Sequence, residues 1–256
     1  MEPAALPPVS VSQNSTTEDT RAVAALIDHT LLKPEATSTD VAMVCGEARE
    51  WGFASVCVNP YWVKLAAELL AGSGPRVCTV IGFPLGANLT AAKLAEAESA
   101  IAQGAHELDM VQNIGALLSG DQDFVREEIR RLAALAHQHG AILKVILETC
   151  LLSDEQKVTA ASLALDAAAD FVKTSTGFSK AGATVHDVKL MRRTVDHKLG
   201  VKASGGVRTL EALRHMVRAG ASRIGTSSGV SIMHELTATQ SMHSPGQSEP
   251  PPQASY

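Results

Sequence analysis

The sequence predicts an α/β fold in which a single domain forms a (β/α)8 TIM barrel. Short runs rich in Val, Ile and Cys alternate with long amphipathic stretches rich in Ala, Leu, Glu and Arg, which is the pattern of strands alternating with helices. Polar residues recur inside or at the ends of many of these strands, where a barrel gathers its active site. A Gly-x-Gly-x-x-Gly turn after the first strand is absent, which disfavours the alternative, an open doubly wound sheet.

Eight strands are expected, and the first of them is weak. In chain order they are residues 27–30, 55–59, 77–82, 107–111, 143–148, 171–175, 201–204 and 223–227. Amphipathic helices fill the intervals, and in the one that begins after Ser153, Ser153 and Gln156 have the spacing of a capping box. Several helices are expected to end at a glycine that leads directly into a strand, namely Gly52, Gly104, Gly140, Gly200 and Gly220. These junctions indicate a repeated βα unit.

The two ends of the chain differ in composition from the middle. Seven of the eleven prolines lie in the first or last twenty residues, together with many Ser, Thr and Gln residues. Such segments bury too little apolar surface to offset the entropy lost on ordering. We therefore expect flexible tails over residues 1–19 and 237–256 and a barrel domain over residues 20–236.

Charge and cysteine content exclude several classes of protein. With 22 basic and 27 acidic side chains interspersed, the net charge of -5 offers no basic stripe for nucleic acid or for an anionic membrane. No apolar run approaches the roughly 20 residues of a membrane span, and the N-terminus lacks the features of a signal peptide. The four cysteines include no Cys-x-x-Cys pair, which suits reduced thiols and predicts a cytoplasmic protein.

Charged residues embedded in apolar strands are the first functional signal. They are Asp109, Lys144, Lys173 and Lys202, and burying them costs several kcal/mol unless they are paired. If Lys173 and Lys202 both face the barrel interior, like charge and desolvation favour a neutral, nucleophilic amine. The alternative is that each lysine reaches solvent or pairs with Asp109 or Glu148. Lys144, at the start of its strand, is the one expected to be a structural partner of Asp109.

Glycine-rich turns after the last two strands are the second signal. Gly205 and Gly206 lead into a helix near Thr209, and the segment from Gly225 to Gly229 opens another short helix. Backbone N–H groups and the helix dipole favour an anion at such positions, and these two loops of a barrel commonly bind phosphate. We therefore expect a phosphate site there. No metal is expected, because His137 and His139 point in different directions on their helix.

Seven segments together resemble the deoxyribose-phosphate aldolase family. They are LIDHTLLKPEAT, SVCVNP, ELDMVQNIG, LKVILETC, VKTSTGF, VKASGGVRT and RIGTSSG. The match runs from about Ile27 to Gly229 and so covers every expected strand. The resemblance implies reversible cleavage of 2-deoxy-D-ribose 5-phosphate to D-glyceraldehyde 3-phosphate and acetaldehyde. It implies a lysine Schiff base and neither metal nor cofactor. Another phosphate-binding barrel lyase or isomerase, or a barrel that binds a sugar phosphate without turning it over, is the alternative.

The resemblance also implies a role for individual residues. Lys173 would be the Schiff-base nucleophile, Lys202 its electrostatic and proton-relay neighbour, and Asp109 the acid/base. The residues expected to hold phosphate are Gly177, Gly205, Gly206, Arg208, Gly225, Ser227 and Ser228. The supporting residues are Asp28, Cys57 and Lys144.

Three positions depart from the family pattern or extend beyond it. Phe178 stands where some members carry a lysine, so this loop is expected to contact phosphate through its backbone only. Gln112 stands where an apolar residue is common. Family members can bring a terminal tyrosine over the site, which raises the same question for Tyr256. The exposed helical faces of a barrel are compatible with a homodimer.

Overall fold

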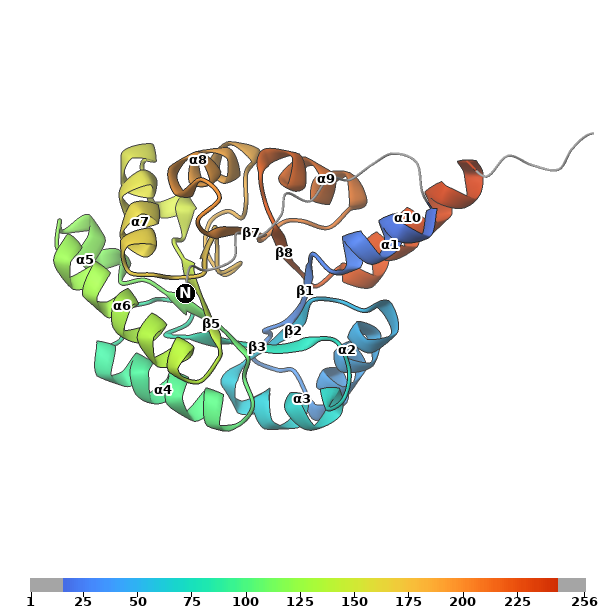
Figure 1. The fold of residues 1–256 in the computed structure, drawn as a ribbon, viewed down its shortest axis with the longest axis horizontal. Helices are drawn as coiled ribbons and strands as arrows, with labels where there is room; N and C mark the ends of the chain where they lie inside the picture. The colour runs from blue at the N-terminus through green and yellow to red at the C-terminus, as the bar shows by residue number, and fades with distance from the viewer. Residues whose placement is uncertain (1–15, 244–256) are drawn as a thin grey trace, which may run out of the picture.

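A computed structural model describes residues 16–243 and confirms the barrel. Eight parallel strands close in chain order, β1 to β8, and helices form an outer ring around them (Figure 1). The strands are β1 (Ile27–Leu31), β2 (Ser55–Val58), β3 (Arg76–Ile81), β4 (Glu107–Val111), β5 (Ile142–Ile146), β6 (Phe171–Lys173), β7 (Gly200–Ser204) and β8 (Arg223–Thr226). Every expected strand is present, although β2, β3, β5, β6 and β8 end one or two residues before the expected bounds.

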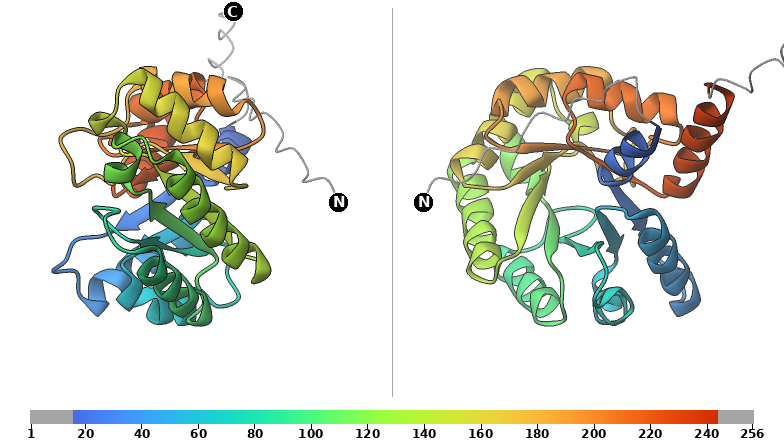
Figure 2. Two further views of the ribbon diagram at one scale, coloured as in Figure 1. Left: turned by 90° about the vertical axis from the view of Figure 1, so that its left-hand side faces the viewer. Right: turned by 45° about the vertical axis from the view of Figure 1, so that its right-hand side comes forward.

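The helices enclose the strands from all sides, as two further views show (Figure 2). They are α1 (Thr16–Ala24), α2 (Ser38–Trp51), α3 (Val63–Leu70), α4 (Thr90–Ala102), α5 (Ile114–Leu118), α6 (Gln122–Gln138), α7 (Asp154–Asp166), α8 (Val185–Val195), α9 (Leu210–Ala219) and α10 (Gly229–His243), with short 3-10 helices at Pro60–Trp62 and Thr149–Leu151. None of the helices within residues 16–243 is long and apolar enough to cross a membrane.

Helical structure extends further towards both ends than the composition suggested. Helix α1 begins inside the segment expected to be a flexible tail, and α10 continues to His243, beyond the expected end of the barrel domain at residue 236. The two helices pack against each other beside β1 (Figure 1). Mutual packing therefore orders segments whose own sequences are polar. The outer parts of both expected tails lie outside the described residues.

Local sequence signals account for several helix ends. The capping box of α7 is confirmed, because the Ser153 hydroxyl accepts from the Gln156 N–H and the Gln156 side chain accepts from the Ser153 N–H. Gly52 and Gly220 adopt the left-handed conformation at the ends of α2 and α9, as expected. The expectation was wrong for Gly200, which is the first residue of β7. This position requires a residue without a side chain, because a Cβ there would lie 2.1 Å from the Phe171 ring.

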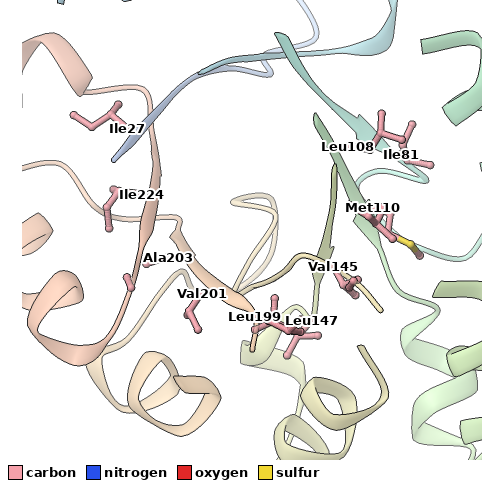
Figure 3. Packing of buried hydrophobic residues seen from close by; sticks show 14 of the residues in the cluster. Ile27, Ile81, Leu108, Met110, Val145, Leu147, Leu199, Val201, Ala203 and Ile224 are labelled. Atoms are coloured by element: carbon pink, nitrogen blue, oxygen red, sulfur yellow. The ribbon is translucent and has the colours of Figure 1, made fainter. Parts of the chain in front are cut away.

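Successive side chains along each strand point alternately outwards, towards the helices, and inwards, to the centre of the barrel. Apolar side chains such as Leu108, Met110, Val201 and Ile224 belong to the large buried cluster that includes the helices (Figure 3). Their neighbours in sequence, Asp109 and Lys202 among them, are directed to the inside of the barrel, where they contact one another. The barrel interior is thus charged, and the apolar core lies between strands and helices.

Candidate active site

Three buried ammonium groups converge on the carboxylate of Asp109 inside the barrel. The Nζ atoms of Lys173 and Lys202 lie 2.8 and 2.6 Å from Oδ2, and Nζ of Lys144 lies 2.7 Å from Oδ1. Strand pairing explains the convergence, since Lys173 is directly opposite Lys202 and Lys144 is directly opposite Asp109. The four charged residues singled out by the sequence therefore meet in one place. The expected pairing of Lys144 with Asp109 is present.

A second layer of charges lies next to this group. Asp28 Oδ2 is 2.6 Å from Nζ of Lys202, and Asp28 Oδ1 is 2.6 Å from the Arg223 guanidinium. Glu107 contacts Arg223 at 3.1 Å and Lys144 at 2.6 Å. Sequence reasoning included Asp28 and missed Glu107 and Arg223. The available signal for Glu107 was its position two residues before Asp109, which gives both the same face of β4.

Glu148 does not join this network, although it was an alternative partner for the lysines. Its carboxylate accepts hydrogen bonds from the N–H and hydroxyl groups of Thr176. The hydroxyl of Thr176 in turn accepts from the N–H of Phe178 at 3.0 Å. Glu148 therefore orders the loop that follows β6 rather than the ammonium groups inside the barrel.

The charges fix which groups stay ionised. Burial alone would raise the pKa of Asp109, but the ammonium groups of Lys144, Lys173 and Lys202 hold it well below its usual range. Burial would lower the pKa of Lys202, but the carboxylates of Asp109 and Asp28 raise it. Lys202 is thus held as a cation. For Lys202 this is opposite to the expectation that like charge and desolvation favour the neutral amine, because the two carboxylates outweigh both effects.

Lys173 has fewer carboxylate contacts than its neighbour. Its only ion pair within residues 16–243 is to Asp109, an anion that also contacts Lys144 and Lys202. Loss of the proton from Lys173 leaves Asp109 paired with two cations. Of the three amines on Asp109, Lys173 has the fewest carboxylate partners.

A small apolar cluster lies beside the charges, on β2, β3 and the residue after β1. Leu32, Cys57, Cys78 and Val80 form a buried cluster, and Phe83 packs against it. Cys78 also contacts the charged group, because its Sγ lies 3.3 Å from Asp109 Oδ1 and 3.2 Å from Lys144 Nζ. The sequence analysis included Cys57 and missed Cys78. The signal for Cys78 was its alternation with Val80 on a strand beside β4.

The loops after β6, β7 and β8 lie at the carboxyl ends of the strands, where phosphate was expected. Gly177, Gly205 and Gly206 all have φ between 82° and 86°, a region that favours glycine. A Cβ on Gly205 would lie 3.7 Å from the Cα of Gly177, so the loops after β6 and β7 are in contact. Arg208 and Ser227 are exposed beside them. The Ser228 N–H is already engaged, since it donates to the Thr226 hydroxyl.

Two hydroxyl groups near these loops were missed. The Oγ atoms of Ser175 and Ser204 are buried, and neither has a hydrogen-bond partner among the described residues. Both residues follow or end a strand that carries a lysine, and such groups are normally satisfied. They are available to a bound polar molecule.

Gly225 provides a direct test of how closely this end of the barrel is packed. A Cβ at this position would lie 2.3 Å from Ser204 Oγ and 3.0 Å from Lys202 Cε. We expect Gly225→Ala to lower the free energy of unfolding by about 1–3 kcal/mol, as overpacking does, and to impair turnover by displacing Lys202. Urea denaturation measures the change in the free energy of unfolding, and a steady-state assay measures the change in turnover.

The matched control for Gly225→Ala is Gly46→Ala. Gly46 lies in α2, and a Cβ there meets nothing within 4 Å. This variant should be at least as stable as the unmodified protein, since alanine favours a helix by about 0.5–1 kcal/mol over glycine. Equal effects of the two substitutions would contradict the packing argument.

Two of the three positions that depart from or extend the family pattern have contacts that explain them. Phe178 packs edge-on against Phe83, with ring centroids 5.3 Å apart, so it bridges the loops after β6 and β3. The Gln112 amide donates to the Leu147 carbonyl at 2.9 Å and links the ends of β4 and β5. Tyr256 lies outside the described residues.

The donor set around Asp109 is a poor match for a metal ion. The ligand atoms of Cys57, Cys78 and Asp109 lie within 4.8 Å of one another, but both oxygens of Asp109 already contact ammonium groups. Those positive charges oppose a further cation. The absence of a metal requirement stays a prediction.

Comparisons with known proteins agree with this geometry. The model of the DeoC/LacD family aldolases matches residues 22–235. The deoxyribose-phosphate aldolase of Brevibacillus brevis is 61% identical over 216 residues, covering 84% of this chain and 96% of its own. That of Lysinibacillus sphaericus is 59% identical over 215 residues, with 84% and 96% covered.

Solved structures lead to the same family. The aldolase QR15 superposes with a TM-score of 0.82 at 42% identity, covering 87% of this chain and 99% of its own. A tetrameric deoxyribose phosphate aldolase from Aeropyrum pernix has a TM-score of 0.81 at 36% identity, with 88% and 94% covered. The resemblance deduced from the motifs is confirmed: this chain belongs to the DeoC/LacD family of aldolases.

Proposed function

We propose that this protein cleaves 2-deoxy-D-ribose 5-phosphate reversibly into D-glyceraldehyde 3-phosphate and acetaldehyde, with Lys173 as the Schiff-base nucleophile. The observation that carries the proposal is the shared carboxylate: Lys173 and Lys202 both contact Asp109 Oδ2, at 2.8 and 2.6 Å. The high identity to curated deoxyribose-phosphate aldolases supports the choice of substrate.

In the cleavage direction, neutral Lys173 attacks the aldehyde carbon of the open-chain sugar. Loss of water gives an iminium, whose positive nitrogen accepts the electron pair of the breaking bond between C2 and C3. The C3 hydroxyl loses its proton, and C3 leaves as the aldehyde of D-glyceraldehyde 3-phosphate. The remaining enamine takes a proton at C2, and water releases acetaldehyde from Lys173. The scheme balances without a metal or redox cofactor.

In this scheme Asp109 transfers the protons, and Lys202 provides the positive charge that stabilises the reacting groups. The Asp109 carboxylate accepts the proton from the C3 hydroxyl and returns it to the enamine, directly or through one water molecule. Lys202, held charged by Asp109 and Asp28, stabilises the oxyanion that develops at C3. Lys144, Glu107 and Arg223 hold Asp28 and Asp109 in place.

The glycine-rich loops and their serines hold the phosphate. Gly177 and Gly205 lie in adjoining loops with exposed or half-exposed backbone, and Arg208 and Ser227 add a charged and a polar side chain. Phosphate at this rim directs the sugar carbonyl down towards Lys173. Such positioning increases the reaction rate, because less entropy is then lost in reaching the transition state.

Turnover of the natural substrate tests the proposal. Purified protein incubated with 2-deoxy-D-ribose 5-phosphate should release acetaldehyde and D-glyceraldehyde 3-phosphate in equal amounts, as measured by a reductase-coupled assay. The unphosphorylated sugar should be cleaved far more slowly because it lacks the anchor. Binding of the phosphorylated sugar without product would favour a sensor, and a rearranged sugar phosphate would favour an isomerase.

Lys202→Leu tests the electrostatic role of the second lysine. Turnover should fall by on the order of 10²–10⁴-fold, the range typical for a proton-transfer or charge-stabilising group. The loss should appear in kcat rather than in KM, because the oxyanion that Lys202 stabilises develops only in the transition state. Lys189→Leu on the exposed surface of α8 is the matched control. A kcat for Lys202→Leu close to that of the unmodified protein would contradict this role.

The homodimer and the cytoplasmic location stay predictions. The Aeropyrum pernix enzyme is tetrameric, so sedimentation of this protein should distinguish a dimer from a larger assembly.

A further inference from the structure

Two cysteines lie side by side in the barrel wall that faces the reacting groups. Cys57 in β2 and Cys78 in β3 are directly paired in the register of these neighbouring strands. Their sulfur atoms lie within 4.8 Å of each other, and both side chains are free and fully buried. Neighbouring strands place their Cα atoms about 4.8 Å apart, which is within the range that a disulfide can bridge.

Cys78 connects this pair to the charges inside the barrel. Its thiol donates to Asp109 Oδ1 at 3.3 Å, and its sulfur accepts from Lys144 at 3.2 Å. These are the contacts that orient the carboxylate opposite Lys173. A change at the Cys78 sulfur therefore acts directly on the position of Asp109.

From this geometry we propose that Cys57 and Cys78 form a site of reversible oxidation, in which a peroxide converts the two thiols to a disulfide that switches off the aldolase site. The loss of activity rests on the proposed function. Cys57 attacks the peroxide, giving a sulfenic acid and one water. Cys78 then attacks that sulfur, forming the disulfide and releasing a second water. The two thiols lose two electrons and two protons, and hydrogen peroxide is reduced to two molecules of water.

The surroundings assign the first attack to Cys57. The Cys78 side chain lowers the pKa of Cys57 by hydrogen bonding to its sulfur, an effect that outweighs burial, and the ammonium groups of Lys202 and Lys173 act in the same direction. Burial raises the pKa of Cys78, and the carboxylate of Asp109 adds to this. Once Cys57 is ionised, the Cys78 thiol can donate to it instead of to Asp109.

A small oxidant can reach this cysteine pair from the barrel mouth, which distinguishes the pair from an inert buried thiol. The proposed reaction requires acetaldehyde to pass between the barrel mouth and Lys173, and hydrogen peroxide is smaller than acetaldehyde. Bulky thiol reagents should not follow the same route. Cys45, on the buried face of α2, and Cys150, in the 3-10 helix after β5, belong to elements outside the barrel strands and serve as internal controls.

The experiment treats the full-length reduced protein with hydrogen peroxide, removes the peroxide, alkylates the remaining thiols under denaturing conditions and digests with trypsin without reduction. Cys57 and Cys78 fall in different tryptic peptides, residues 50–64 and 77–93, each with one cysteine. We expect these peptides to become linked as activity falls by roughly tenfold or more, the effect of losing a hydrogen bond to a charged group. Dithiothreitol should restore both separate peptides and activity.

Two variants, each compared with its own untreated sample, make the test specific. Cys78→Ser should lose the linked peptide and the dithiothreitol-reversible part of the inactivation, whereas the double variant Cys45→Ser with Cys150→Ser should keep both. The proposal is overturned if activity falls with no link between the two peptides, if the link forms without loss of activity, or if the double variant loses the response. Mass spectrometry detects the link without turnover, so an untreated protein that cleaves no deoxyribose 5-phosphate would overturn the proposed function instead.

Discussion

Lys173→Ala should reduce aldol cleavage by a factor on the order of 10⁴ or more while leaving the barrel folded. Loss of a nucleophile that forms a covalent intermediate has effects of this size in other enzymes. Alanine removes the amine that we propose forms the iminium, whereas Lys144 and Lys202 remain paired with carboxylates. Steady-state cleavage of 2-deoxy-D-ribose 5-phosphate measures the loss.

Folding of Lys173→Ala can be checked separately. Asp109 keeps Lys144 and Lys202 as partners, so the circular dichroism spectrum and the barrel architecture should be preserved. Retention of more than about a hundredth of the activity in a folded Lys173→Ala protein would contradict its role as nucleophile.

Asp109→Asn should have the largest effect on stability of any single substitution at the site. The neutral amide leaves Lys144, Lys173 and Lys202 facing one another with their shared anion removed. Removing one partner of a buried ion pair lowers the free energy of unfolding by about 3–5 kcal/mol. The free energy of unfolding from urea denaturation measures the change, and turnover should be lost as well.

The effect of Asp109→Asn should depend on pH in one direction. Because the pKa of Asp109 is held well below its usual range, its contribution to stability is fully present above the unfolded-state value of about 3.9 and is lost as pH falls through the folded-state value. The difference between the two proteins should therefore be constant near neutrality and shrink in acid. A difference that grows below pH 4 would contradict the charged form assigned to Asp109.

Asp123→Asn is the control for Asp109→Asn. Asp123 forms an exposed pair with Arg126, and its side chain is 87% exposed. Exposed ion pairs contribute little to the free energy of unfolding, because water and salt screen the charges. No measurable change in stability is expected.

Sequence reasoning located the barrel and the charged residues that meet inside it because both have one-dimensional signals. A charge inside an apolar strand, as at Asp109 or Lys202, is costly and therefore conspicuous. The pairing of these charges across strands, by contrast, depends on the register around the closed barrel. Register places Lys202 opposite Arg223 at the start of β8, a residue that reads in sequence as an ordinary strand end.

The missed residues share the same physical reason. Cys78, Ser175 and Ser204 are small side chains that also occur in any core, and only their neighbours in three dimensions distinguish them. The extent of α10 depends on packing against α1, which its composition does not reveal. The bridge between Phe83 and Phe178 joins residues from separate loops, and no local pattern predicts it.

Reductive trapping tests the central claim most directly. Borohydride added to protein and acetaldehyde should convert the iminium to a stable secondary amine on Lys173. Because trypsin does not cleave at an alkylated lysine, the adduct should appear on the peptide of residues 158–180. A reduced adduct on Lys202 would reverse the assigned roles of the two lysines, and the absence of an adduct on either would contradict Schiff-base chemistry at this site.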